Sequence, residues 1–389
     1  MARLQTDGVD VESNALRWAR ERRGLDLATA AKKLGLDSAR LQELELGSER
    51  PSASQLREAA NVYRVSPASF FLPDELRPAF EAPSDFRTMP ADSHEPFSIE
   101  LRDAINRVYA QVRILRRLIE LPQVAHLSDA PHLASHDAVE ANAERIRKWL
   151  ELAKSLLSET IENDASSHLD FWIRRIESKG YFITQVSGVN VEEMRGFCLP
   201  DPFFPMIVLN GADAPTGRLF SLIHELVHLL GGESGVCNDP ESSNKSERFC
   251  NELAAATLMP EADSRNDWVT FLLRSKESGT TEALRTVSRR YGVSPESLMR
   301  RFVTLGLANF EEYMSTRALL LSEFASKPKR KSTGGPDREV LILRNLGRPY
   351  VEAVMDARRR LDISDYEAAQ FIFAKTRWLE PVEQQLALR

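Results

Sequence analysis

The chain has 389 residues, a formal net charge of −6 and an apolar fraction of 42%. This length suits about two to four domains, and the acidic balance argues against a protein that coats nucleic acid along its whole surface. No apolar run reaches the ~18 residues of a membrane span, and the sequence does not start with a signal-peptide pattern. Three cysteines without a CxxC pair do not make a disulfide framework or a zinc knuckle. We therefore expect a cytoplasmic globular protein.

Short helices separated by glycines occupy the first part of the chain. Residues 14–23, 27–34 and 38–46 have helical periodicity, and each run is followed by a glycine, which favours helix termination. Asp26 can cap the second helix, and Asp37 or Ser38 the third. Two short helices joined by a turn that contains glycine indicate a helix-turn-helix unit.

This region resembles the Xre/Cro-type repressor domain over about sixty residues. The residues that carry the resemblance are Leu16, Arg17, Ala19, Arg20, Gly24, Leu25, Ala30, Ala31, Leu34, Gly35, Leu36, Leu41, Leu44, Glu45, Gly47, Pro51, Ser52, Leu56, Tyr63 and Val65. The resemblance implies that the third helix enters the major groove of DNA. The candidate DNA contacts are then Ser38, Arg40, Gln42 and Glu43.

Two observations leave the partner of this domain open. Ala28 stands where the family usually has a polar residue, and residues 1–80 contain twelve basic and twelve acidic side chains. The domain therefore lacks a net basic footprint. It can bind DNA, or it can be a docking module for a partner repressor.

A Pro-rich segment and two long helical patterns follow. Residues 74–96 have the irregular composition of a linker, and the periodicity then predicts helices over 99–121 and 138–157. The arginines of the first long helix are typical of a solvated face, although an acidic partner is an alternative reading.

The only clear β signal precedes an apolar helix. Residues 180–186 and 204–210 are rich in β-branched and aromatic residues, and 196–199 is expected to lie between them as a third strand. A small sheet therefore leads directly into the helix around residues 220–230.

That helix contains the pattern His-Glu-x-x-His. Residues four apart share one helical face, so His224 and His228 can bind one metal ion, with Glu225 at its edge. The alternative is that the pattern arises by chance and that both histidines are core residues. A catalytic zinc needs one more protein ligand. The downstream candidates are Glu233, Asp239, Glu241, Glu247 and Glu252.

Two segments together resemble the ImmA/IrrE family of metallopeptidases. They are Phe220 to His228, and the pattern Glu247-x-x-Cys250-Asn251-x-Leu253-Ala254-Ala255-x-x-Leu258-Met259-Pro260. The resemblance implies that Glu247 is the third ligand of one Zn²⁺ per chain and that Asn251 supports the ligands from outside. Cys250 and Leu253 stand where the family commonly has Ala and Phe. Glu225 is then the general base that activates water and later protonates the leaving amine.

Two cysteines raise the question of latency. Cys237 follows the second histidine in a Gly-rich loop, and Cys198 lies on a predicted strand beside the cleft. Either thiolate could close the open zinc position and hold the enzyme inactive. The alternative, a small buried apolar residue, is the more common role of a free cysteine.

These interpretations combine into an α+β, mostly helical fold. They predict a helix-turn-helix bundle, a central gluzincin-like peptidase domain with a small sheet, and a C-terminal helical module. The expected boundaries are 1–72 for the helix-turn-helix domain, 73–137 for the linker and long helix, 138–322 for the peptidase domain, 323–336 for a basic linker and 337–389 for the C-terminal module.

The resemblance implies a site-specific zinc endopeptidase that cleaves an Xre-type repressor and so induces stress-response or phage-defence genes. DNA is an expected partner, as an operator or a single-stranded activator, and a homodimer is compatible with the sequence. The alternative is a DNA-binding regulator or antitoxin whose peptidase domain is a sensor or is inactive.

Overall fold

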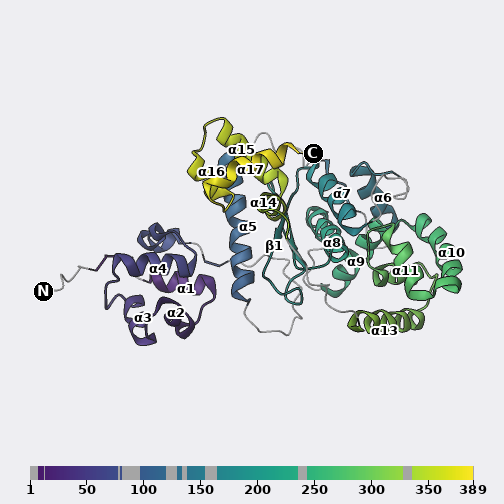
Figure 1. The fold of residues 1–389 in the computed structure, drawn as a ribbon, viewed down its shortest axis with the longest axis horizontal. Coiled ribbons are helices and arrows are strands. Elements are labelled where there is room, and N and C mark those ends of the chain that lie inside the picture. Colours follow the sequence, from purple (N-terminus) through teal and green to yellow (C-terminus); the bar gives the residue numbers. More distant parts are fainter. Residues whose placement is uncertain are drawn as a thin grey trace. The chain divides into compact units, whose positions relative to one another are not determined.

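The computed structural model describes residues 8–12, 14–77, 79–80, 97–119, 129–133, 138–153, 164–234, 243–326 and 335–388. The chain forms two compact units, and residues 110–389 make up most of the second. Most of the described residues are helical, as expected, and there is one small sheet (Figure 1). No helix in the described ranges combines the length and apolar character that crossing a membrane requires.

The first unit is a bundle of short helices. Gly24 and Gly35 end the first two helices in the left-handed conformation, and Asp26 accepts a hydrogen bond from the Thr29 backbone, which confirms the predicted caps. Asp37 caps the third helix in the same way. The elements are α1 (Ala15–Arg23), α2 (Leu27–Leu34), α3 (Ser38–Glu45), α4 (Ala53–Tyr63) and the 3₁₀ turns η1 (Pro67–Phe71) and η2 (Asp74–Leu76).

One side of these helices is apolar and closes a small core. Leu16, Leu41, Leu44 and Leu56 are buried together from three different helices, α1, α3 and α4. Burial of such side chains contributes about 1.5–3 kcal/mol each, which compensates for the marginal stability of short helices. The helix α5 (Ile99–Leu118) begins in this unit, and Asp103 on it pairs with Arg23 of α1 at 2.9 Å.

The sheet of the second unit contains three strands, β1 (Phe182–Val186), β2 (Gly196–Leu199) and β3 (Met206–Asn210). Their order is β1-β3-β2, with β1 parallel and β2 antiparallel to β3. Every residue of the strands is buried. The predicted third strand at 196–199 is confirmed as β2. In space, β3 lies at the centre of the sheet and pairs with both other strands.

Two helices of the next group, α7 and α8, pack on this sheet, and the others pack on neighbouring helices. The group consists of α6 (Val139–Trp149), α7 (Ala165–Glu177), α8 (Pro215–Ser234), α9 (Ser243–Leu258), α10 (Glu261–Ser278), α11 (Thr280–Arg289), α12 (Pro295–Thr304) and α13 (Phe310–Ser326). The predicted helix over 138–157 is wrong at its end, because α6 stops at Trp149. Glu151 adopts φ 57 there, and the Leu152 amide turns back to the Arg147 carbonyl. A non-glycine residue therefore ends α6 in the left-handed conformation.

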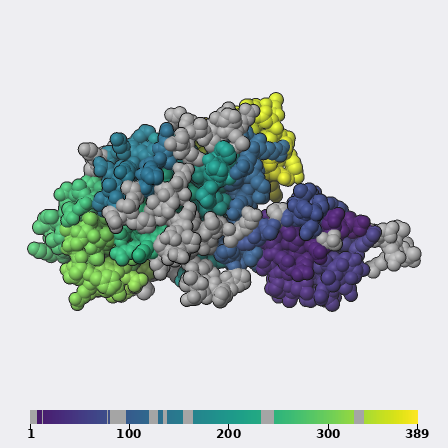
Figure 2. Space-filling model, turned by 180° about the vertical axis from the view of Figure 1, so that it is seen from behind, coloured from purple at the N-terminus to yellow at the C-terminus, as the bar shows by residue number. Residues whose placement is uncertain are grey.

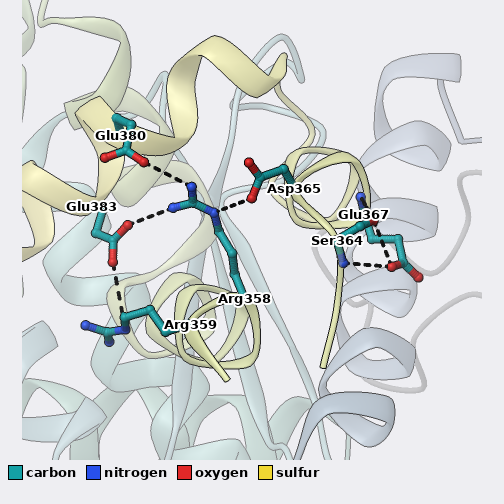
Figure 3. A network of polar contacts seen from close by, with 7 residues as sticks. All are labelled: Arg358, Arg359, Ser364, Asp365, Glu367, Glu380 and Glu383. Atoms are coloured by element: carbon teal, nitrogen blue, oxygen red, sulfur yellow. Dashed lines mark hydrogen bonds and ion pairs between the residues drawn. The ribbon is translucent and has the colours of Figure 1, made fainter. Parts of the chain in front are cut away.

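The C-terminal helices pack on the same unit. They are α14 (Arg338–Leu346), α15 (Arg348–Arg359), α16 (Asp365–Phe371) and α17 (Leu379–Ala387), with the 3₁₀ turn η6 (Thr376–Trp378). Arg358 holds three of them together by pairing with Asp365, Glu380 and Glu383 at 2.7, 3.0 and 2.8 Å (Figure 3). The α14 helix lies against β1 (Figure 1), where Gln111 of α5 donates to the Leu346 carbonyl at 3.1 Å.

Candidate metal centre

The helix α8 is buried on most of its surface, which fixes the direction of its polar side chains. Leu222, Ile223, Leu226 and Val227 are fully buried, and α8 packs against β2, β3, α7 and α9. A helix that is apolar around most of its circumference is held by its neighbours on several sides. Its few polar side chains therefore take defined positions.

Three side chains from two helices converge on one point. The Nε2 atoms of His224 and His228 lie 3.0 Å apart, and the Glu247 carboxylate from α9 lies 3.4 Å from the first and 3.3 Å from the second. All three ligand atoms lie within 4.8 Å of one another. Of the candidates for a third ligand, the structure describes the side chains of Glu247 and Glu252, and of these two it brings Glu247 to both histidines.

The spacing of these atoms suits a small tetrahedral cation. Zinc binds nitrogen and oxygen ligands at about 2.0–2.2 Å, which separates two tetrahedral ligand atoms by roughly 3.3 Å. The distances of 3.0, 3.3 and 3.4 Å are close to that value. His228 is 5% exposed, whereas His224 and Glu247 are 15% and 31% exposed. The residues fit a metal site that is closed on the His228 side and open on the other.

Burial and the neighbouring histidines change the pKa of Glu247 in opposite directions. Partial burial disfavours its charged form, but the hydrogen bonds with His224 and His228 outweigh burial and hold the pKa of Glu247 well below its usual range. A carboxylate that stays ionised is the form that binds a cation.

The other rings and helix turns support this cluster. The Cys250 Sγ atom lies 3.9 Å from Nδ1 of His228, and Phe220 stacks on the His224 ring with centroids 6.4 Å apart. The Asn251 side chain donates to the backbone carbonyl of Glu247 at 2.8 Å, so it stabilises the helical turn that carries the ligand. This contact between Cys250 and a candidate ligand was not predicted from the sequence.

Glu225 lies beside the cluster and is 7% exposed. Burial raises the pKa of Glu225, while the neighbouring histidines and a hydrogen bond with Cys198 oppose that change. Gly196 leaves space for the carboxylate, because a Cβ atom at this position would lie 3.3 Å from the Glu225 Cγ. This use of glycine at the start of β2 was not foreseen, although an isolated Gly in a strand does signal close approach.

Comparison with protein-family models divides the chain into two known parts. Residues 182–303 match the IrrE N-terminal-like domain, a peptidase family, and residues 13–70 match a helix-turn-helix domain. The chain therefore carries a helix-turn-helix domain and an IrrE-like peptidase domain. Both predicted resemblances are confirmed. Comparison with curated proteins found none that matches this chain.

The IrrE-like peptidase domain contains the whole cluster. The matched span begins at β1 and includes β2, α8 and α9, so Gly196, Glu225 and the three candidate ligands all belong to it. The helices α13 to α17 follow after its end at residue 303. What those helices do is not implied by the family.

The two cysteines that could close the open zinc position, Cys198 and Cys237, have different outcomes in the structure. Cys198 is fully buried, bonds with Glu225 and does not contribute to the cluster of three converging ligand atoms. Cys237 lies outside the described residues, as do Asp239 and Glu241 and the side chain of Glu233. Glu252 pairs with Arg248 at 2.9 Å on the outer side of α9.

The helix-turn-helix domain presents its candidate DNA contacts to solvent. Ser38, Arg40, Gln42 and Glu43 are all exposed on α3. Arg40 pairs with Glu49 at 2.9 Å, which compensates part of its positive charge. The structure therefore keeps these side chains accessible for a DNA or a protein partner.

Proposed function

We propose that this protein is a zinc-dependent endopeptidase that cleaves a partner repressor at one site. The single observation that carries the proposal is the convergence of His224, His228 and Glu247 beside the buried carboxylate of Glu225. A His₂Glu ligand set with an adjacent glutamate is the arrangement that hydrolytic zinc sites use. The match to a peptidase family supports the same chemistry.

Each residue has a defined task in this proposal. His224, His228 and Glu247 hold the zinc ion, which supplies Lewis acidity and lowers the pKa of water. Glu225 accepts a proton from the attacking water and later transfers it to the nitrogen of the leaving amine. Its burial keeps bulk water away from the carboxylate. Peptide-bond hydrolysis is therefore balanced: water adds across the C–N bond, and no other reactant is needed.

The substrate class follows from the domain that accompanies the peptidase. A helix-turn-helix domain can bring the enzyme to an operator or to a repressor of its own type. We propose that the substrate is an Xre-type repressor, that cleavage induces stress-response or phage-defence genes in the cytoplasm, and that DNA activates the reaction.

Two variants test the peptidase proposal. Purified protein with zinc is incubated with an Xre-type repressor encoded near it, with and without DNA, and the products are identified by mass spectrometry. We expect one cut, and we expect Glu225→Gln to abolish it while zinc stays bound. Glu252→Gln is the matched control on the surface of α9 and should cleave normally. Absence of cleavage by a zinc-loaded protein contradicts the proposal.

The alternative function is a transcriptional regulator or antitoxin that binds an operator directly. The exposed residues of α3 favour it. Operator binding that weakens at least about tenfold in an Arg40→Ala, Gln42→Ala double variant supports this alternative. If Glu225→Gln leaves gene induction unchanged, the protein acts as a regulator and not as a peptidase.

A further inference from the structure

The helix α13 carries an apolar stripe that its own unit leaves exposed. Phe310, Met314, Leu321 and Phe324 are 67%, 44%, 52% and 80% exposed. At about 100° per residue they fall within an arc of roughly 80° on one face of the helix. Exposed apolar side chains that gather on one face of a helix are typical of a surface that binds a partner. Figure 2 shows the yellow-green part of the chain that contains α13 at the surface.

The rest of α13 is firmly attached, so the stripe has a fixed direction. Tyr313 and Thr316 are buried against the unit, and the Tyr313 hydroxyl donates to Glu296 of α12 at 2.9 Å. Glu323 accepts from Thr281 of α11 at 2.7 Å. These contacts hold one side of the helix, and the stripe lies on a neighbouring side.

The order of side chains along the stripe is nearly the same in both directions. It begins with Phe310 and Met314, has Arg317 at its centre, and ends with Leu321 and Phe324. An isologous contact needs such a self-complementary surface, because each copy presents the same residues to the other. An antiparallel pair of helices crossing at Arg317 places each phenylalanine at the opposite end of its partner. Such a pair also aligns the helix dipoles favourably.

The central charge is compatible with this crossing. Arg317 pairs with Glu296 of its own chain at 2.9 Å and is 45% exposed. Each arginine therefore brings its own counter-ion to the crossing point. This pair is partly solvated, so it contributes little to affinity but lowers the repulsion between the two guanidinium groups.

The area of the stripe suits a weak dimer. The four apolar side chains expose roughly 500 Å² of apolar surface, judged from the size of such side chains. Two copies facing each other would bury about 1,000 Å², the lower limit for a specific interface. A different protein could bind here only with a complementary apolar surface of its own. A second copy of this chain already carries such a surface.

We propose that α13 is a self-association surface on which two copies of this chain dimerise through antiparallel α13 helices. Because α13 follows the peptidase match, this surface is a property of the chain beyond the family domain. The proposal does not depend on the peptidase function.

Sedimentation of the full-length protein tests this inference. Between about 1 and 300 µM we expect a monomer–dimer equilibrium with a Kd of about 10 to 100 µM. Leu321→Glu should weaken it at least about tenfold, because the carboxylate would be desolvated in the contact. Leu319→Glu is the matched control: Leu319 is 51% exposed but lies on the opposite face of α13.

Cross-linking distinguishes the antiparallel arrangement from other contacts. Under mild oxidation, Arg317→Cys should form a disulfide-linked dimer through residue 317 of both copies, whereas Phe310→Cys should not. A disulfide-linked dimer of Phe310→Cys overturns the proposal, because residue 310 faces its own copy when the helices are parallel and not when they are antiparallel. A protein that stays monomeric over the whole concentration range also overturns it and assigns the stripe to a different partner. Equal effects of Leu321→Glu and Leu319→Glu overturn it as well.

Discussion

The ring nitrogens of His224 and His228 lie 3.0 Å apart although they come from successive turns of α8. Two neutral imidazoles at this distance can share one proton, whereas a cation between them and Glu247 satisfies all three groups at once. The three side chains should therefore bind a metal ion together.

Glu247→Gln should lower the affinity for zinc at least about a hundredfold, because it removes the anionic member of the cluster that the structure describes. Glu252→Gln is the matched control, since both glutamates lie on α9 and are 31% exposed. The measurements are the zinc content after dialysis and the rise of Tm on adding zinc, which should be present in the control and absent in Glu247→Gln. Equal zinc content in both variants would sink the assignment of Glu247.

Gly196→Ala should reduce peptidase activity while zinc stays bound. The added Cβ would lie 3.1 Å from the Val208 carbonyl oxygen and 3.3 Å from the Glu225 Cγ, so the carboxylate must move by a few tenths of an ångström. Displacement of a general base costs about tenfold to a hundredfold in rate. Gly335→Ala, where a Cβ meets nothing within 4 Å, should be fully active. An active Gly196→Ala would show that Glu225 tolerates displacement.

Glu177 should make the protein less stable as the pH rises from about 4.5 to 8. Burial and the nearby charge of Glu352 raise the pKa of Glu177 to about 8, although Arg348 opposes this change. The folded state binds the proton of Glu177 more tightly than the unfolded state does. The contribution of this proton to the free energy of unfolding is therefore fully present below pH 4.5 and is lost as the pH passes 8.

The variant Glu177→Gln should consequently be more stable than the parent at pH 8. We expect a gain of about 2 kcal/mol, less than the full change in pKa implies, because water still reaches part of this side chain. Thermal unfolding between pH 4.5 and 8 is the measurement, and the difference should vanish at the acidic end. A constant difference in Tm at every pH would contradict the assignment.

The buried ion pair of the helix-turn-helix domain should be essential to that domain. Arg20 donates to both carboxylate oxygens of Glu45 at 2.7 and 2.9 Å, and Glu45 is 4% exposed. Glu45→Ala leaves a buried guanidinium without this partner and should destabilise the domain by about 3 kcal/mol. Hydrogen exchange of peptides from this domain measures the loss.

The exposed pair of Arg17 and Glu21 provides the control for that experiment. Its side chains are 54% and 51% exposed, so Arg17→Ala, which leaves both partners of the buried pair in place, should change the stability by less than about 0.5 kcal/mol. A double variant, Arg20→Met with Glu45→Leu, should recover most of the loss, because an apolar pair of similar volume needs no counter-ion. Equal protection in Glu45→Ala and Arg17→Ala would contradict the role of the buried pair.

Local signals were sufficient where a helix begins or ends at a capping residue. Asp26 and Asp37 were expected to cap helices, and both accept a hydrogen bond from the backbone three residues later. The end of α6 at Trp149 was missed, because Glu151 adopts a left-handed conformation that this residue type rarely takes. The order of the strands in the sheet was not predicted, because pairing partners depend on the packing of the whole unit and not on a single segment.

The sequence by itself determined the peptidase pattern, because the spacing of His224 and His228 on a helix follows from its 3.6-residue period. Its resemblance to known families also pointed to Glu247 and to the helix-turn-helix domain. Only the tertiary structure decided that Glu247 meets both histidines, that Gly196 and Cys198 border Glu225, and that α13 leaves an apolar face uncovered. These relationships depend on how α8, α9 and the sheet pack, and packing joins residues that the order of the chain keeps apart.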